Sequence, residues 1–180
     1  YKKDLTLIVL LIFFYLVLLY IDNGTRLNYQ FDGNLIDRYL HSQDVVEKIE
    51  GRVFISDDDI YVASGYLYAT GSDPTEYNFQ HHPLVKNLLG YSTKYLKGPY
   101  LIQVFFGISI LVMTYIMGMQ FFKKRNIAFL ASTLLMVDPV FRETSISGLL
   151  DMGQAAFSMA YLTSALFLPQ MWLLQGVLLG

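Results

Sequence analysis

The chain has 180 residues, of which 54% are apolar, 16% aromatic and 16% charged, with a formal net charge of −2 and no cysteine. This composition excludes a disordered chain and a basic nucleic-acid-binding domain, so we expect no nucleic-acid partner. The charged share lies below the roughly 25% of soluble domains, and the apolar residues fall in long runs. We therefore expect an integral membrane protein that sits in a lipid bilayer. The lack of cysteine excludes disulfides and thiolate metal sites.

The first apolar run extends from Leu5 to Ile21. At about 1.5 Å per residue a helix of this length covers roughly 26 Å, close to a hydrocarbon core of about 30 Å. The basic start at Lys2 and Lys3 is also found in signal peptides. However, a signal peptide has a shorter apolar core and a small-residue cleavage site, and this run ends in tyrosine, isoleucine and aspartate. A membrane span is therefore the favoured prediction over a signal peptide.

Four more apolar runs follow: Leu101–Phe122, Ile127–Val137, Leu149–Leu168 and a last run from Met171. The last run reaches Gly180 without a polar flank, so we expect this sequence to be part of a longer protein with an incomplete final span. The predicted fold class is an all-α integral membrane protein. It has about five transmembrane helices and an outer-face loop with short interfacial helices.

The basic residues predict the orientation of these spans. One cluster lies at Lys2 and Lys3, and the other is the turn 123–125. Basic residues near span ends mark the cytoplasmic side, and both clusters fall on that side if the chain crosses at each run. We therefore expect a multi-pass protein of the plasma (inner) membrane with a cytoplasmic N-terminus. Residues 1–21 form the first span, 22–99 an outer loop, and 100–180 the remaining spans.

The outer loop holds most of the acidic residues, including the triplet Asp57, Asp58 and Asp59. Ser56 before the triplet predicts a helix N-cap with Asp59 in a capping box, and Gly71 predicts the C-terminal end of that helix. Acids in a first turn are also stabilised by the helix dipole. A structural role therefore explains the triplet by itself. The functional alternative is a general base, because such a base must be a positioned carboxylate near an acceptor hydroxyl.

A second helix is predicted from Pro83, because proline suits the first turn of a helix. Leu84, Leu88, Tyr91 and Tyr95 fall near one face, which is typical of an interfacial helix. His81 and His82 precede the proline. Two histidines without a third ligand are a weak signal for metal, so we favour capping or packing and expect neither metal nor cofactor.

The third segment lies between the third and fourth spans and contains Asp138-Pro139, Arg142, Ser145 and Asp151. An ionisable residue within a bilayer costs about 2.5 to 3.5 kcal/mol at a helix centre and is a candidate for function. Asp151 lies near a span end, where this cost is lower. Its structural alternative is an acid stabilised in the first turn of a helix.

Taken in order, these segments resemble the C-type, polyprenyl-phosphate-dependent glycosyltransferases. The closest resemblance is to the dolichyl-phosphate-mannose-protein mannosyltransferases and their bacterial aminoarabinose-transferase relatives. Asp58-Asp59-Ile60-Tyr61 resembles the acidic pair of that family, and the segment from His81 to Lys86 resembles its His-Pro-Pro-Leu-Gly-Lys motif. Asp138-Pro139 and the stretch from Ser145 to Asp151 keep the family's spacing. The resemblance covers nearly the whole chain but only the first third or so of such an enzyme.

The resemblance implies a membrane enzyme that moves a sugar from a polyprenyl-phosphate donor to an acceptor hydroxyl on the outer face with inversion. It implies that Asp58 is the catalytic base, or Asp57 if the register shifts by one, with Asp59 as the second acid. It also implies donor-phosphate binding by three residues, Arg142, Lys86 and His81.

One departure from the family pattern supports an alternative from another class. Where the family has an arginine after serine, this chain has Ile146, which cannot bind phosphate. Arg142 lies one helical turn earlier and could replace that arginine if the stretch is helical. The alternative is a catalytically inactive relative that serves as a structural or accessory subunit, with partner membrane subunits.

Overall fold

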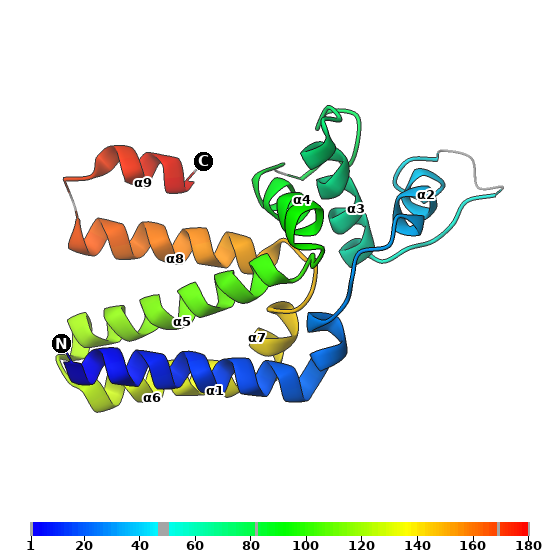
Figure 1. The fold of residues 1–180 in the computed structure, drawn as a ribbon. Coiled ribbons are helices and arrows are strands. Elements are labelled where there is room, and N and C mark those ends of the chain that lie inside the picture. The colour runs from blue at the N-terminus through cyan, green and yellow to red at the C-terminus, as the bar shows by residue number, and fades with distance from the viewer. Residues whose placement is uncertain (1, 47–50, 82, 169, 180) are drawn as a thin grey trace. The chain divides into compact units, whose positions relative to one another are not determined.

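The computed structural model describes residues 2–46, 51–81, 83–168 and 170–179. Within these ranges the regular elements are helices, and the nearest approach to a strand is a single bridge between Ser42 and Val53 (Figure 1). The chain folds as two compact units. Unit 1 comprises residues 1–23, 104–145 and 151–180, and unit 2 comprises residues 24–103 and 146–150.

Unit 1 contains the two long apolar helices and the shorter helices that follow the second of them. These are most of α1 (Lys2–Leu27) and α5 (Leu101–Phe122), with α6 (Arg125–Val137), α7 (Pro139–Thr144), α8 (Asp151–Phe167) and α9 (Trp172–Leu179). Helix α1 is interrupted at Asn23, whose φ of −152° and ψ of 48° are not helical, and unit 1 takes the part up to that residue.

Two helices, α1 and α5, are long and apolar enough to cross a membrane, judged by length and composition. The predicted bounds of the second run, Leu101 and Phe122, are those of α5. The predicted run from Ile127 becomes α6, which has 13 residues and at about 1.5 Å per residue is roughly 20 Å long. In the part of the chain that the structure describes, the fold is therefore all-helical, with two candidate membrane-spanning helices.

Ion pairs and small residues hold the helices of unit 1 together. Asp4 on α1 accepts a 2.6 Å hydrogen bond from Arg125 Nε at the start of α6. Gly118 on α5 lies so close to Ala128 on α6 that a Cβ at Gly118 would be 2.9 Å from the Ala128 Cα. Small residues allow such close backbone approach, which is the usual way helices associate in membranes.

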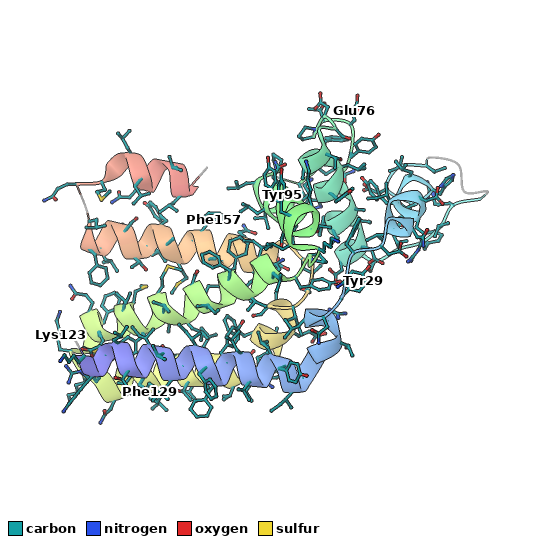
Figure 2. The ribbon with its side chains drawn as sticks, viewed as in Figure 1. Tyr29, Glu76, Tyr95, Lys123, Phe129 and Phe157 are labelled. Atoms are coloured by element: carbon teal, nitrogen blue, oxygen red, sulfur yellow. The ribbon has the colours of Figure 1, made fainter. Side chains whose placement is uncertain are left out.

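Aromatic packing joins α5 to α8 in the same unit. The rings of Phe106 on α5 and Phe157 on α8 have centroids 5.7 Å apart in an edge-to-face arrangement, and Phe157 is labelled in Figure 2. Edge-to-face pairs are favoured because the positive ring edge meets the negative face of its partner.

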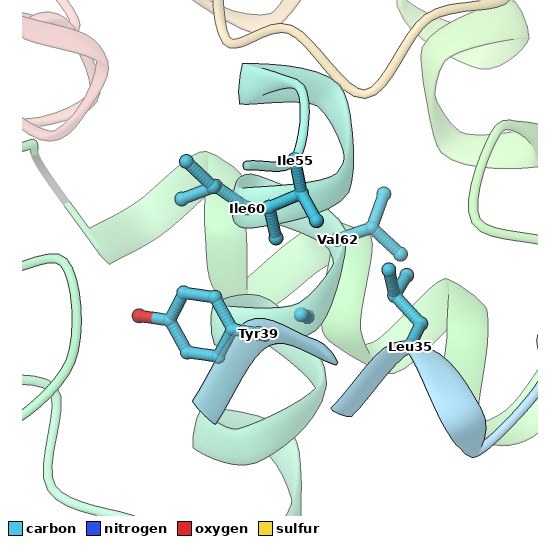
Figure 3. Packing of buried hydrophobic residues seen from close by; sticks show 6 residues of the cluster. Leu35, Tyr39, Ile55, Ile60 and Val62 are labelled. Carbon is cyan, nitrogen blue, oxygen red and sulfur yellow. The ribbon is translucent and has the colours of Figure 1, made fainter. Parts of the chain in front are cut away.

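Unit 2 contains α2 (Asn34–Leu40), α3 (Asp57–Thr70) and α4 (Pro83–Leu96). Its core is a cluster of buried apolar side chains from α2, the start of α3 and the chain before α3 (Figure 3). The members are Leu35, Tyr39, Ile55, Ile60, Val62 and Ala63.

Helices α3 and α4 cross through two glycines. A Cβ at Gly65 on α3 would overlap the carbonyl oxygen of Lys86, and a Cβ at Gly90 on α4 would overlap the carbonyl oxygen of Gly65. The two backbones therefore touch, which is possible only where neither residue has a side chain. This crossing fixes the position of α3, whose first turn carries the aspartate triplet.

Helix α4 begins at Pro83, as predicted, and has two contrasting faces. Leu84, Tyr91 and Tyr95 are 50%, 48% and 68% exposed, and Tyr95 is labelled in Figure 2. Lys86 and Leu89, on the other face, are fully buried. The predicted helix is present, with Leu88 of its predicted face half-buried, and its place at a membrane interface stays a prediction.

Candidate functional site

The aspartate triplet lies in the first turn of α3. The predicted caps at both ends of this helix are confirmed. Ser56 is the N-cap, and its hydroxyl accepts a 3.2 Å hydrogen bond from the Asp59 N–H. Gly71 ends the helix in the left-handed conformation, with φ of 109°. Glycine adopts this conformation without the steric cost that a Cβ brings.

The three carboxylates of the triplet have different surroundings, because successive residues of a helix point about 100° apart. Asp57 is exposed. The Asp58 side chain is 16% exposed and lies 3.6 Å from Arg26 Nη1. Asp59 lies 3.9 Å from Arg38 Nη2. Of the three, Asp58 is therefore the carboxylate that the protein encloses most.

Gly148 brings the loop 146–150 against Asp58. Its backbone N–H donates a hydrogen bond to the Asp58 carboxylate. A Cβ at Gly148 would overlap that carboxylate and lie 2.8 Å from the Asp58 carbonyl oxygen. The loop is held in turn by Gln103 on α5, whose Nε2 donates to the Leu149 carbonyl at 2.5 Å. The aspartate triplet and the loop 146–150, distant in sequence, thus meet at Asp58.

Burial raises the pKa of the Asp58 carboxyl above its ordinary value. The Gly148 N–H and the Arg26 guanidinium oppose this shift, and the neighbouring Asp59 adds to it. Removal from water disfavours the charged form, so an enclosed carboxylate binds a proton more tightly than an exposed one. A carboxylate with a raised pKa is a stronger base, which is the property that general-base catalysis requires.

The arginine beside this carboxylate lies against a pair of tyrosines. The Arg26 guanidinium lies 5.9 Å from the centre of the Tyr100 ring, and the ring centroids of Tyr100 and Tyr29 are also 5.9 Å apart. Burial and then the Asp58 charge raise the pKa of the Tyr100 hydroxyl. Tyr100 therefore keeps its proton at neutral pH and offers a hydrogen-bond donor near the base.

Lys86, predicted to bind donor phosphate, lies in the interior of unit 2. It is fully buried, and its ammonium donates to the Tyr68 hydroxyl at 3.1 Å, the Asn78 carbonyl at 2.5 Å and the Asn78 side-chain oxygen at 3.2 Å. An ammonium has three donors, and protein oxygens accept from all of them. In this arrangement Lys86 joins α4 to α3 and to the loop between them.

The other two predicted phosphate ligands also have protein partners. His81 Nε2 lies 3.2 Å from the Tyr61 hydroxyl, and the two rings pack edge to face. His82 lies outside the described residues. Helix α7 ends at Thr144, so the helical stretch that would let Arg142 replace an arginine at position 146 stops short of that position. Arg142 belongs to unit 1. There its Nε donates to Asp22 at 2.5 Å and its Nη1 to the Val137 carbonyl at 2.5 Å.

No protein-family model, curated protein or solved structure matches this chain. The resemblance therefore depends on the order of its motifs, and function has to be argued from the site. Within the described ranges no group of three or more acidic or histidine side chains could hold a metal ion. The chemistry available at the site is that of Asp58, Arg26, Tyr100 and the Gly148 N–H.

The site residues missed by the sequence analysis are Arg26, Tyr29, Tyr100 and Gly148. A local signal exists for Arg26, because in the predicted topology it is a basic residue at the outer end of the first span, where the positive-inside rule disfavours it. The other three carry no such signal, because their roles depend on contacts between distant parts of the chain.

Lys86 should make the stability of unit 2 depend on pH. Burial lowers the pKa of Lys86 to about 8, and the Asp44 carboxylate opposes this shift in part. The pKa of a lysine in the unfolded chain is about 10.4, which is about two units higher. Between these values the unfolded chain binds a proton that the folded chain does not, so stability rises with pH. We expect the free energy of unfolding of the purified chain to increase between about pH 7.5 and about pH 9.5.

Lys86→Met is the matched variant for this measurement, because it keeps the unbranched stem and removes the titrating group. Its unfolding, followed by circular dichroism at the same pH values, should lack the increase. An equal increase in wild type and variant would show that another group titrates.

Proposed function

We propose that this protein is a membrane glycosyltransferase. It moves a sugar from a polyprenyl-phosphate donor to an acceptor hydroxyl, with inversion at the anomeric carbon. The observation that supports this proposal is the enclosed Asp58 carboxylate, which accepts from the Gly148 N–H and lies beside Arg26. Such a carboxylate has the surroundings of a general base.

In this reaction Asp58 accepts the proton of the acceptor hydroxyl while the hydroxyl oxygen bonds to the anomeric carbon. The bond from that carbon to the phosphate oxygen breaks at the same time, and its electrons leave with the polyprenyl phosphate. A neutral hydroxyl is a poor nucleophile until a base accepts its proton. The departing phosphate needs stabilisation of its charge rather than an acid, so one base and a cationic surrounding suffice.

Acceptor-dependent release of polyprenyl phosphate is the direct test. The full chain is reconstituted in lipid nanodiscs with a radiolabelled polyprenyl-phosphate sugar, and release is measured with and without added glycosyl acceptors. We expect release to depend on the acceptor and the product to have the inverted anomeric configuration by NMR. Purified chain that binds the donor but transfers no sugar to any acceptor would contradict the proposal.

An accessory subunit is the second candidate, and the burial of Ile146 favours it. This side chain is fully buried at the position where the resemblance implies a phosphate-binding arginine. In that case the chain should co-purify in stoichiometric amount with other membrane proteins and show no transfer. A monodisperse chain that carries bound polyprenyl-phosphate sugar would argue for the enzyme.

We also propose the finer arrangement in the membrane. The remaining apolar helices complete about five spans in the plasma membrane, the N-terminus is cytoplasmic, and residues 22–99 are outside. The exposed face of α4 then rests on the lipid headgroups, where tyrosine rings are enriched.

Single-cysteine labelling should report this orientation clearly, because the chain has no cysteine of its own. Glu76 and Lys124 are both exposed, and Glu76 is labelled in Figure 2. We expect a membrane-impermeant maleimide to label Glu76→Cys in intact cells, and Lys124→Cys only after the membrane is permeabilised. Labelling of both positions in intact cells would contradict the proposed topology.

A further inference from the structure

Arg26 stands at the boundary between the enclosed carboxylate and solvent. It belongs to the last turn of α1, and its side chain is 44% exposed, whereas that of Asp58 is 16% exposed. Its Nη1 lies 3.6 Å from Asp58 Oδ2 and donates to the Ile146 carbonyl at 3.3 Å. A guanidinium thus contacts the backbone at position 146, although the side chain of that residue is an isoleucine.

The remaining donors of Arg26 form a fork. Among the described residues, both polar contacts of Arg26 run through Nη1. A guanidinium carries five N–H groups in one plane, so the edge formed by Nε and Nη2 keeps its donors. This edge matches two oxygens of a phosphate, which arginine binds through paired, parallel hydrogen bonds.

The Tyr100 ring helps to hold this plane in place. The guanidinium carbon lies 5.9 Å from the ring centroid, and Tyr100 in turn packs against Tyr29. A cation over an aromatic face is attracted by the ring quadrupole. The side chain is therefore supported by the loop 146–150 on one atom and by an aromatic ring on its face.

Taking the proposed glycosyl transfer as its basis, we propose that Arg26 is the residue that binds the phosphate of the polyprenyl-phosphate donor. Sequence reasoning assigned this role to Lys86, Arg142 and His81. Lys86 uses its three donors inside the protein, and Arg142 is bonded to Asp22 and to the Val137 carbonyl. Among the described residues, Arg26 is the cation in contact with the proposed base.

This assignment couples donor binding to the strength of the base. In the free protein the Arg26 charge opposes the rise in the Asp58 pKa caused by burial. A phosphate bound to the fork neutralises part of that charge, so the Asp58 pKa rises further and Asp58 becomes a stronger base when the donor is present. The acceptor hydroxyl is then deprotonated only where a leaving group is already held.

The test measures binding of polyprenyl phosphate itself to the full chain in nanodiscs, with inorganic phosphate as the competing probe. Arg26→Gln should weaken polyprenyl-phosphate binding about 10- to 100-fold, the range expected for lost hydrogen bonds to a charged group. Arg38→Gln is the matched control, because Arg38 also pairs with an acid of the triplet and its side chain is 53% exposed. Its affinity should stay within about threefold of wild type, since a rim ion pair contributes little.

Arg26→Lys keeps the charge and loses the fork, and it replaces Arg26→Gln in the test if the glutamine variant has lost its helical circular-dichroism signal. In transfer assays, both variants should raise the KM for the donor, and Arg26→Gln, which removes the charge, should also move the acidic limb of the pH profile to higher pH. A purely structural role would not move that limb. Competition by inorganic phosphate would show that the headgroup alone is recognised. If inorganic phosphate does not compete but binding still depends on Arg26, recognition requires the whole polyprenyl phosphate.

The outcomes separate the two proposals. If the wild type binds polyprenyl phosphate through Arg26 but transfers no sugar, the proposed function fails and the phosphate site stands. If the wild type transfers sugar and the Arg26 variants keep the wild-type donor KM and affinity, the phosphate site is wrong and the function stands. Absence of polyprenyl-phosphate binding by the wild type would overturn both.

Discussion

Asp58→Asn should reduce sugar transfer by about 100- to 10,000-fold, the range that a general base contributes. An amide of nearly equal size keeps the shape of the site but cannot accept the proton of the acceptor hydroxyl. The measurement is acceptor-dependent release of polyprenyl phosphate at saturating donor, so that the loss appears in kcat. Donor binding should change much less, because the base acts on the acceptor.

Asp57→Asn is the matched control for this experiment. Asp57 is the preceding residue in the same first turn and is exposed, so its removal should change transfer by less than about twofold, as surface substitutions do. The resemblance left the choice between Asp57 and Asp58 open. Transfer that survives Asp58→Asn but not Asp57→Asn would move the base to Asp57. Transfer that survives both substitutions would remove the triplet from catalysis.

Gly65→Ala should destabilise unit 2 severely, by about 3 kcal/mol or more. In an exposed helix the same substitution stabilises by up to about 1 kcal/mol, so the sign of the effect is informative. Here the new methyl group would overlap the Lys86 carbonyl oxygen on α4. Two helix backbones cannot yield as a flexible side chain can, so the helices must separate.

The measurement is thermal unfolding in detergent followed by circular dichroism, with Gly90→Ala as a second variant at the same crossing. Gly33→Ala is the control in the same unit, because a Cβ at Gly33 has no neighbour within 4 Å. We expect both crossing variants to melt well below wild type and the control to melt near it. Equal melting temperatures for all of them would mean that α3 and α4 do not touch through these glycines.

The parts of the fold that local chemistry determines could be predicted from the sequence. Ser56 and Gly71 predict both ends of α3, because capping depends on residues next to the helix. Pro83 predicts the start of α4, and the apolar run predicts both ends of α5. The number of membrane spans is shown only in part: α1 and α5 have the length and composition of a span, and the other predicted spans stay predictions. An apolar run measures hydrophobicity, whereas the length of its helix depends on where the chain turns.

The site itself depends on contacts that no local pattern contains. The hydrogen bond from Gly148 to Asp58 joins residues 90 positions apart, so neither the choice of Asp58 over Asp57 nor the role of Gly148 is visible in the triplet. Lys86 is a cationic residue of the kind that a phosphate site requires, but it is buried. Its burial follows from the glycine crossing of α3 and α4, which brings its ammonium under Tyr68 and Asn78.

Two acids near the ends of the apolar part of α1 form ion pairs with arginines that come much later in the sequence. Asp4 bonds to Arg125 and Asp22 to Arg142, at separations of 121 and 120 residues. During synthesis on a ribosome, the first helix is therefore made before either of these arginines. It reaches its final place only after α6 and α7 have emerged. In nascent chains that stop before Arg125, we expect this helix to be extractable from the assembling bundle. In chains that extend past Arg142, we expect the helix to be retained.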